Sequence, residues 1–350
     1  PVGAGRCGPA SRGVASRGAA STLRFPEKLA VWPAAEAQAE GADPLDGHGM
    51  LYVADTGRHR ILACSLRADA DGWPLARFER SFGVADEAGR DDGPLPRFHG
   101  PRGLTRDGDR LIVADAGNHL VRAVDLRSGA ATTLLGSGRL GRNLQPGDPR
   151  RPLQLDLRSP YDVALSDGAL LIAMAGSHQI WALLTDRGHA GPMIGSGAED
   201  HVDGPVAQSA LAQPSGLAVY GRYLSWVDAE TSSVRLVDLE GGEVMTLVGR
   251  GLFDFGDADG RAADVRLQHP SDLAVTEGAI FVADTYNGKI KQIDPATGVT
   301  STVASGLVEP GGIEVLGGFL LVADTGNHRL VAVRREDGAQ REVVIEGLPG

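Results

Sequence analysis

Short runs of alternating hydrophobic and polar residues fill most of this chain, and turn-forming residues separate them. The clearest unit, residues 104–138, reads LTRDGDR, LIVADAGNH, LVRAVDLRSG and AATTLLGSG. Alternation with a period of two is typical of β-strands that bury one face. Each of the four segments combines a strand with a turn signal, so the unit predicts four antiparallel strands, a to d, joined by tight turns.

This unit recurs along the chain. Copies of strand b and its turn, such as LYVADTGRHR and LLVADTGNHR, begin at Leu51, Leu111, Leu171, Leu224, Ile280 and Leu320. Repetition of a four-stranded unit predicts an all-β fold, a six-bladed β-propeller with four antiparallel strands per blade. We expect the propeller to occupy residues 21–350, with blades starting near residues 25, 98, 157, 211, 267 and 307. Residues 1–20 are expected to form a disordered leader or linker.

The ADTGNH phrase is expected to form the turn between strands b and c. Glycine adopts positive φ readily, so we expect it at Gly57, Gly117 and Gly326, where the neighbouring Asn also tolerates it. The aligned aspartates should accept backbone N–H bonds across this turn, which makes them structural. They are Asp55, Asp115, Asp284 and Asp324. Met174 replaces the aspartate in the third copy and marks a divergent turn.

Longer inserts connect the blades. RDDGPLPRFHGP, HVDGPVAQSALAQP and DADGRAADVRLQHP share an Asp-Gly turn and end near a proline. In a propeller these inserts share one face, here called the upper face, with the b–c turns, and binding is expected there. The last blade is expected to end with REVVIEG and to supply its own four strands. The ring would then close by packing alone, unless residues 21–24 add an edge strand.

Composition narrows the classes of partner. The chain has 34 basic and 45 acidic residues, so a nucleic-acid partner is not expected, because such affinity depends on basic side chains. No apolar run reaches the ~18 residues of a membrane helix, and no secretory signal is present. A monomeric, cytoplasmic protein is expected. Cys7 and Cys64 form no CxxC motif, and Cys7 lies in the leader, so a disulfide between them is not expected.

Several phrases point to a known family. FPEKLAV, AMAGSHQIW, DGPVAQSALAQPSGLAV and GLFDFGDADG resemble the propeller of the NHL-repeat-containing protein 2 group. The resemblance covers residues 25–347 and implies an NHL-repeat propeller. It also implies a thioredoxin-like domain before the propeller and a small β-rich region after it. Residues 1–350 are therefore expected to be the central propeller of a longer polypeptide.

Residues at or next to the repeated proline are expected to line the upper mouth of the central channel, and they vary between blades. The candidate ligand-binding residues are Glu27, Lys28, Arg102, Tyr161, Asp162, His269, Ser271 and Asp272. Carboxylates at Asp162 and Asp272 could hold a small cationic or polar ligand, or a hard metal ion such as Ca²⁺. The alternative is a solvated mouth whose charges pair with one another.

Support for an enzyme is thin. Ligands to one zinc must all lie within about 2.1 Å of it, which equivalent turns on separate blades cannot achieve. A zinc site built from His59, His119, His178 and His328 is therefore excluded. His99 and His269, which lie just before channel-mouth prolines, are better placed to bind a metal. Related six-bladed propellers include lyases and metal-dependent lactonases, but here only Glu314 adds a carboxylate within otherwise apolar inner strands. We therefore expect no catalytic residue and no cofactor; a calcium or zinc ion at Asp162 and Asp272 is the alternative.

The sequence as a whole favours a non-catalytic platform that binds a protein or peptide on its upper face. The thioredoxin-like domain implied upstream is one candidate partner. If this is right, replacing Asp162 and Asp272 should weaken partner binding and leave stability nearly unchanged. A metal-dependent lyase or lactonase with a site at the channel mouth is the alternative function.

Overall fold

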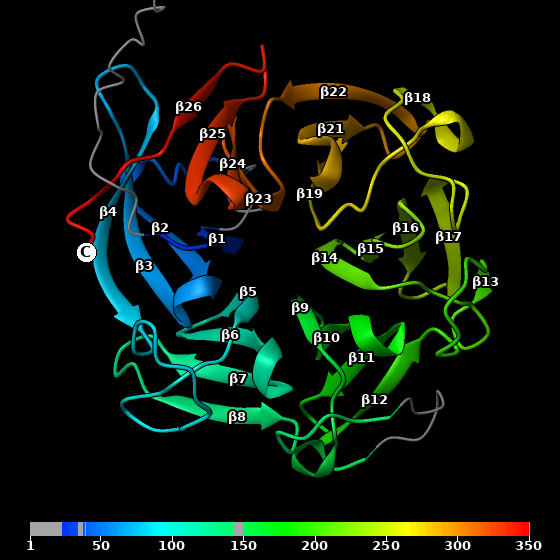
Figure 1. The fold of residues 1–350 in the computed structure, drawn as a ribbon, viewed down its shortest axis with the longest axis horizontal. Helices are drawn as coiled ribbons and strands as arrows, with labels where there is room; N and C mark the ends of the chain where they lie inside the picture. Colours follow the sequence, from blue (N-terminus) through cyan, green and yellow to red (C-terminus); the bar gives the residue numbers. More distant parts are fainter. Residues whose placement is uncertain (1–22, 34–37, 39, 143–149, 350) are drawn as a thin grey trace, which may run out of the picture.

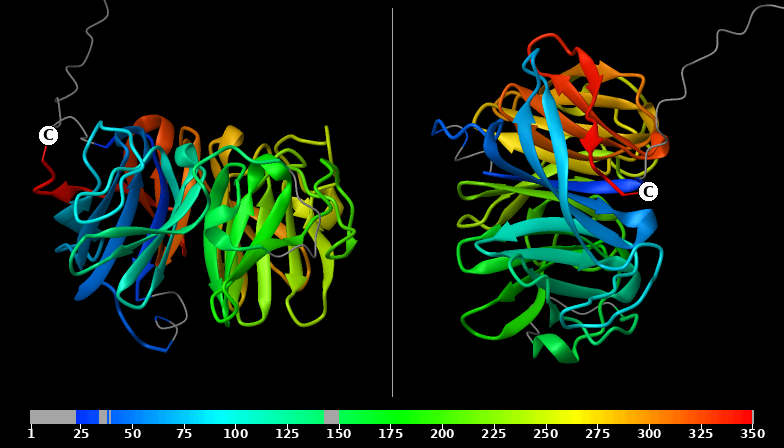
Figure 2. Two further views of the ribbon diagram at one scale, coloured as in Figure 1. Left: turned by 90° about the horizontal axis from the view of Figure 1, so that it is seen from below. Right: turned by 90° about the vertical axis from the view of Figure 1, so that its left-hand side faces the viewer.

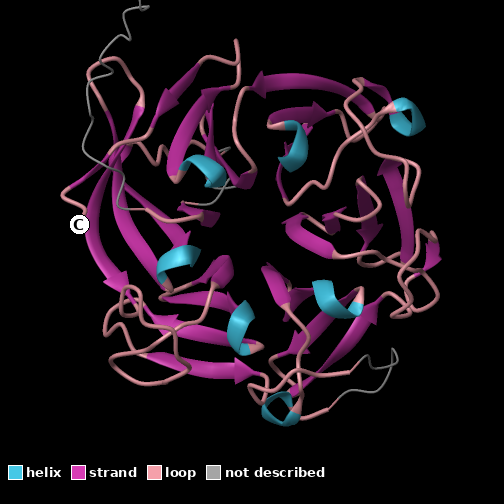
Figure 3. Cartoon of the chain, in the orientation of Figure 1, coloured by secondary structure: helices cyan, strands magenta, loops and turns pink. Residues whose placement is uncertain are grey.

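The computed structural model describes residues 23–33, 38, 40–142 and 150–349. In this part of the chain six β-sheets surround a central axis, as Figure 1 and Figure 3 show. In each sheet strand a is innermost, and strands b to d follow outward in order of sequence. The predicted six-bladed β-propeller of four-stranded antiparallel blades is confirmed.

The blades have the following strands. Blade 1 contains β1 (Pro26–Trp32), β2 (Asp46–Asp55), β3 (Arg60–Ala68) and β4 (Pro74–Phe82). Blade 2 contains β5 (Pro101–Asp107), β6 (Arg110–Asp115), β7 (Leu120–Asp125) and β8 (Ala131–Leu135). Blade 3 contains β9 (Pro160–Ser166), β10 (Ala169–Met174), β11 (Gln179–Leu184) and β12 (His189–Ile194).

The second half of the ring adds short strands at its outer edge. Blade 4 contains β14 (Pro214–Tyr220), β15 (Tyr223–Asp228), β16 (Ser233–Asp238) and β17 (Glu243–Val248), with β13 (Gly204–Pro205) beside β17. Blade 5 contains β19 (Asp272–Thr276), β20 (Ala279–Asp284), β21 (Lys289–Ile293) and β22 (Val299–Ser305), with β18 (Gly260–Arg261) beside β22. Blade 6 contains β23 (Pro310–Leu316), β24 (Phe319–Asp324), β25 (Arg329–Arg334) and β26 (Gln340–Glu342).

Short 3-10 helices form the b–c turns of blades 1, 2, 3, 5 and 6 on the upper face, which Figure 2 shows opposite the tight hairpins. They are η1 (Thr56–Arg58), η2 (Ala116–Asn118), η4 (Ala175–Ser177), η6 (Thr285–Asn287) and η7 (Thr325–Asn327). Two more, η3 (Pro152–Gln154) and η5 (Ala262–Asp264), lie in the inserts before blades 3 and 5. Across the described residues, no helix has the length and apolar character needed to cross a membrane.

The core is divided among the blade interfaces. Six clusters of buried apolar side chains occur in the described residues, and each joins two neighbouring blades. Trp181, for example, packs in the cluster between blades 2 and 3, and Trp226 in the cluster between blades 3 and 4. Because each blade buries both of its faces against its neighbours, its stability depends on the interfaces with both.

In blades 1, 2, 3 and 6 the left-handed residue of the b–c turn is the histidine, which corrects the expectation for the glycines. His59, His119 and His328 have φ of 56°, 55° and 57°. Gly57 instead donates its N–H to Arg24 O at 2.9 Å, and a Cβ there would lie 2.6 Å from that oxygen. Gly117 and Gly326 make the same contact with His99 O and Val308 O. These glycines serve close backbone approach, and positive φ falls to a residue whose side chain has its own function.

The repeated aspartates are structural, as predicted, but their backbone partners lie outside the turn. Asp55 Oδ1 accepts from Arg24 N at 2.7 Å, and Asp115 Oδ1 accepts from His99 N at 2.8 Å. Asp324 accepts in the same way from Val308 N at 2.7 Å. Each donor lies just before strand a of the same blade, so the aspartate ties the start of the blade to its second strand. Met174 lacks this bond.

The turn histidines connect neighbouring blades. Nδ1 of His59 accepts from Gly100 N at 3.1 Å, that of His178 from Gln213 N at 3.2 Å, and that of His328 from Phe25 N at 3.1 Å. Each donor precedes the proline that opens the next inner strand. A bond of this kind contributes about 1 kcal/mol. The repeated histidines are therefore parts of the blade interface, and each uses its Nδ1 as an acceptor.

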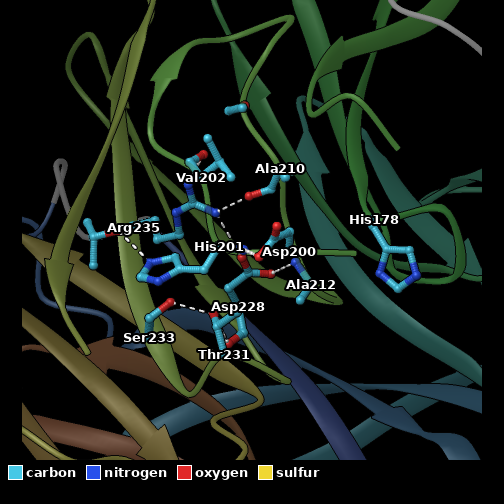
Figure 4. Close-up of polar contacts among 12 residues, drawn as sticks. His178, Asp200, His201, Val202, Ala210, Ala212, Asp228, Thr231, Ser233 and Arg235 are labelled. Atoms are coloured by element: carbon cyan, nitrogen blue, oxygen red, sulfur yellow. Dashed lines mark hydrogen bonds and ion pairs between the residues drawn. The ribbon is translucent and has the colours of Figure 1, made fainter. Parts of the chain in front are cut away.

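The Asp-Gly inserts are anchored by buried cations on strand c. Arg122, Arg235 and Lys291 are fully buried and pair with Asp92, Asp203 and Asp259 at 2.8, 2.8 and 2.7 Å. Figure 4 shows the Arg235 site, where the guanidinium also donates to Val202 O, Ala210 O and Asp228. The three cations occur in blades 2, 4 and 5, which are the blades that follow an Asp-Gly insert. The inserts are therefore fixed parts of the upper face.

The ring closes through hydrogen bonds as well as packing, which corrects the expectation for the last blade. The fourth strand of blade 6 is β26, and the next segment, β27 (Ile345–Glu346), pairs in parallel with β4 of blade 1. Ala76 N donates to Val344 O at 3.2 Å. Residues 23–24 form no strand, and residues 1–22, where the leader and Cys7 were predicted, lie outside the described part. Cys64 is a buried free thiol.

Asp203→Ala should cost about 2–3 kcal/mol of unfolding free energy, because it leaves the buried Arg235 guanidinium short of a partner. Urea unfolding would measure this cost, and hydrogen exchange should show faster exchange in residues 200–212. The matched control is Glu240→Ala, which removes an exposed carboxylate from its pair with Arg222 and should change stability by less than about 0.5 kcal/mol. Equal effects of the two substitutions would contradict the anchoring role.

Candidate functional site

Charged residues and glycines alternate around the centre of the ring. Two residues after the repeated proline, blades 1 to 6 carry Lys28, Gly103, Asp162, Gly216, Asp272 and Gly312. A Cβ at Gly103 would lie 2.6 Å from Asp162 Oδ1, and one at Gly216 would lie 2.6 Å from Asp272 Cα. The glycines of blades 2, 4 and 6 therefore make room for the polar side chains of blades 1, 3 and 5 to meet in the channel.

Lys28 bridges the channel. Its ammonium group donates to Asp162 Oδ2 at 2.7 Å and to Asp272 Oδ1 at 2.6 Å, and all three residues are at most 8% exposed. Asp162 Oδ2 also accepts from Leu217 N at 2.9 Å, and Asp272 Oδ2 accepts from Ile313 N at 3.0 Å. This group, called the Lys28 bridge, joins blades 1, 3 and 5 through ion pairs and reaches blades 4 and 6 through backbone bonds.

Burial and mutual attraction oppose each other in the Lys28 bridge. Burial by itself would lower the pKa of Lys28, but the two aspartates raise it above its ordinary value. Burial raises the pKa of Asp162 and brings that of Asp272 to about 6, although Lys28 acts in the opposite direction on both. Burial also raises the pKa of Glu314 to about 8. The Lys28 ammonium therefore faces the carboxyl groups of Asp162 and Asp272, with Glu314 nearby, and burial raises the pKa of all three acids.

A cavity of about 310 Å³ opens on the upper side of the Lys28 bridge. Its lining includes all eight residues that the sequence predicted for the channel mouth: Glu27, Lys28, Arg102, Tyr161, Asp162, His269, Ser271 and Asp272. The structure thus brings the candidate residues together at one place. That they bind a ligand remains a prediction.

The accessible part of this cavity is organised around Arg102. Its guanidinium donates to Glu27 through Nη2 at 2.8 Å and lies 2.7 Å from the second carboxylate oxygen through Nε. The same guanidinium lies over the Tyr161 ring, 4.2 Å from its centroid. Burial raises the pKa of Glu27, an effect that Arg102 opposes. Arg102 is therefore held on two sides where it lines the cavity.

A second cavity of about 250 Å³ lies on the lower side. Lys28 lines both cavities, so the Lys28 bridge separates them. Apart from Lys28, Glu314, Thr105 and Arg106, the side chains that line it are apolar, and the Arg106 guanidinium lies 4.1 Å from the centroid of the Trp32 ring. The lower cavity therefore offers few polar side chains to a ligand.

The donor set at the channel mouth does not fit a metal ion. Asp162 and Asp272 both direct an oxygen at the Lys28 ammonium, which already supplies positive charge between them. Within the described ranges, no three His, Cys, Asp or Glu side chains form a group that could hold a metal. His269 stacks on Tyr286 with centroids 4.7 Å apart, whereas His99 packs edge-on against His59.

The burial of Asp162 and Asp272 contradicts the expectation that their replacement leaves stability unchanged, because each carries an ion pair and an inter-blade backbone bond. Sequence reasoning also treated Lys28 as one charge among several. The alternation of charge and glycine was the signal that could have shown its position. Gln213 and Tyr286, which also line the upper cavity, had no such signal, because they lie outside the inner strands.

Comparisons with known proteins agree on the fold. No family model matches the chain. NHL repeat-containing protein 2 of Bos taurus is 36% identical over 332 residues, which cover 80% of this chain and 44% of that protein. Protein SUPPRESSOR OF QUENCHING 1, chloroplastic, of Arabidopsis thaliana is 34% identical over 302 residues, covering 77% of this chain and 28% of that protein. The chain thus spans less than half the length of these relatives.

Among solved structures, a chain of the nidogen/laminin complex superimposes with a TM-score of 0.59 at 14% identity, covering 84% of this chain and 92% of that chain. At this level of identity the match concerns the fold alone. It agrees with the propeller architecture described above.

Lys28→Met should cost about 3–5 kcal/mol of unfolding free energy near pH 7.5, because two buried carboxylates would lose their cation. The cost should shrink near pH 5.5. Asp272 has a pKa of about 6 in the folded protein, which is above its value in the unfolded chain. As the pH falls, the folded protein therefore takes up a proton at Asp272, and the repulsion between the two carboxylates is relieved. Denaturant unfolding at both pH values would test this.

The matched control is Lys289→Met, which removes a partly exposed ammonium from its pair with Asp257 and should cost less than about 1 kcal/mol. A cost of Lys28→Met that is the same at both pH values would show that the carboxylates do not repel each other in the variant.

Proposed function

Because the chain belongs to the family of NHL repeat-containing protein 2, with its NHL-repeat propeller, we propose that it is a non-catalytic platform for protein interaction. Its upper face binds a protein or a peptide, and the channel-mouth cavity is the centre of that site. A thioredoxin-like domain, implied upstream by the resemblance of the sequence, is one such partner.

One observation carries the proposal: the charges best placed for chemistry are already paired with each other. Lys28, Asp162 and Asp272 are buried and joined by ion pairs, so a substrate or metal would have to displace these contacts to use them. The polar groups that remain accessible are fixed in position around Arg102 and Tyr161. Fixed aromatic and guanidinium groups in a cavity are typical of protein recognition.

The metal-dependent lyase or lactonase considered above finds less support. Such an enzyme would need carboxylates that converge on an open position for a cation. Here the position between the two carboxylates is taken by the ammonium of Lys28, which reaches it from β1. The inner strands supply only apolar side chains on the lower side, apart from Thr105, Arg106 and Glu314.

Selection of a phage-displayed random dodecapeptide library on the intact chain would test the proposal. We expect the selected peptides to bind Tyr161→Ala, and the double variant Glu27→Gln with Arg102→Gln, at least 10-fold more weakly by calorimetry. The double variant removes both charges together, so no unpaired group remains buried. The control is Arg106→Gln, which removes a cation from the lower cavity and should leave affinity unchanged. Failure to select peptides, or equal binding to all variants, would contradict the proposal.

Metal content separates the platform from the enzyme. Inductively coupled plasma mass spectrometry on protein purified without chelator or affinity tag should find zinc and calcium well below one equivalent. Near one equivalent of either metal, lost in Asp162→Asn, would replace this proposal with the enzyme.

A further inference from the structure

Two aromatic side chains are exposed on the insert between blades 4 and 5. Phe253 is 89% exposed and Phe255 is 57% exposed. Phe253 also has φ of 66°, a left-handed conformation that costs a residue other than glycine about 1–3 kcal/mol. An exposed aromatic side chain on a left-handed backbone contributes little to the stability of the fold, whereas such features are common at binding sites.

The segment that carries these rings is held in place. Asp254 pairs with Arg266 at 2.6 Å, and Gly256 N donates to Leu267 O at 2.9 Å. Asn287 Nδ2 donates to Gly256 O at 2.6 Å, which ties the segment to the b–c turn of blade 5. Because the backbone is already ordered, binding a partner here would cost little conformational entropy.

A groove of about 420 Å³, called the Phe253 groove, is lined by these two rings. Tyr286 and His269, which stack on each other, line it as well. Tyr286 is 59% exposed, and it lines the channel-mouth cavity as well, as does His269. The groove and the cavity are therefore one continuous surface of the upper face.

The charged groups of the Phe253 groove are carboxylates. Glu199 is about half exposed, and its nearest basic group is His178 at 3.8 Å, a ring whose pKa is lowered by burial. Glu230 accepts a hydrogen bond from the neutral amide of Gln213 at 2.8 Å. None of the described residues that line the groove is Lys or Arg. The lining of the groove thus combines an aromatic surface with two carboxylates.

We propose that the Phe253 groove binds an extended peptide segment in which an apolar side chain stands next to a Lys or Arg. The apolar side chain packs between Phe253, Phe255 and Tyr286. The cationic group reaches Glu199 and Glu230 and can lie against the tyrosine ring. This inference rests on the proposed function and names the chemistry of its partner. Single-stranded nucleic acid, which also stacks on aromatic rings, is disfavoured because the carboxylates would repel its phosphates.

Fluorescence anisotropy with labelled octapeptide pools tests the inference. One pool combines Leu and Phe with Lys and Arg, a second combines Leu and Phe with Asp and Glu, and a labelled octamer of thymidylate is the third probe. The intact chain should bind the basic pool at least 10-fold more tightly than the acidic pool or the oligonucleotide. Raising the salt from 50 to 500 mM should weaken binding of the basic pool, because the ion pairs are exposed.

Peptide binding to substituted variants of the chain tests where the site lies. Phe253→Ser with Phe255→Ser should weaken binding of the basic pool at least 10-fold. Glu199→Gln with Glu230→Gln should reduce the preference for the basic pool at least threefold. The matched control is Tyr223→Ser, which removes an exposed aromatic ring from a hairpin on the lower face and should change nothing. All the substituted side chains are partly or mostly exposed, so the variants should fold.

Two results would overturn the inference. Equal affinity for the basic and acidic pools, or tighter binding of the oligonucleotide, would show that the charge of the groove does not select the partner. Binding that survives Phe253→Ser with Phe255→Ser but is lost in Tyr161→Ala would move the site to the channel mouth, which leaves the proposed function intact and removes this groove from it. If neither the intact chain nor any variant binds a peptide, both this inference and the proposed function are wrong.

Discussion

The contact between the Lys28 ammonium and the carboxylates of Asp162 and Asp272 determines what the centre of this propeller can be. Three alternate blades each send one charged side chain inward, and the remaining three carry glycine, so the charges can meet. The resulting ion pairs lie between an upper cavity and a lower one and occupy the buried carboxylates. The surfaces proposed to recognise a partner lie on the turns and inserts of the upper face.

The architecture could be predicted from the sequence because it depends on repetition. Six copies of a four-strand pattern specify the ring, and the varied residues next to each proline specify its mouth. The errors came from side chains that act across blade boundaries. His59 and His328 reach into the next blade, and Arg235 holds an insert that lies far from it in sequence. A repeat unit read by itself cannot show which neighbour its polar groups will contact.

Internal comparison of the repeats nevertheless shows two patterns that predict such contacts. Arg122, Arg235 and Lys291 stand where the other blades have Leu62, Trp181 and Val331, and a basic residue occurs only where an Asp-Gly insert precedes the blade. The charge of Lys28 and the glycines between the charged blades form a second pattern of this kind. Both patterns follow from burial, since a buried charge must have a partner and a crowded axis must have space.

The parallel pairing of β27 with β4 affects how the chain becomes a ring. Ile345 meets Ala76, a contact that spans most of the sequence, and contacts of this kind form late because a long loop must close first. Before residues 345–346 emerge from the ribosome, the apolar seam between blades 1 and 6, with Leu29, Leu51 and Leu321, has no complete partner. During synthesis the protein is therefore an incomplete ring with an exposed apolar surface at its end. This surface can bind chaperones or aggregate until the ring closes.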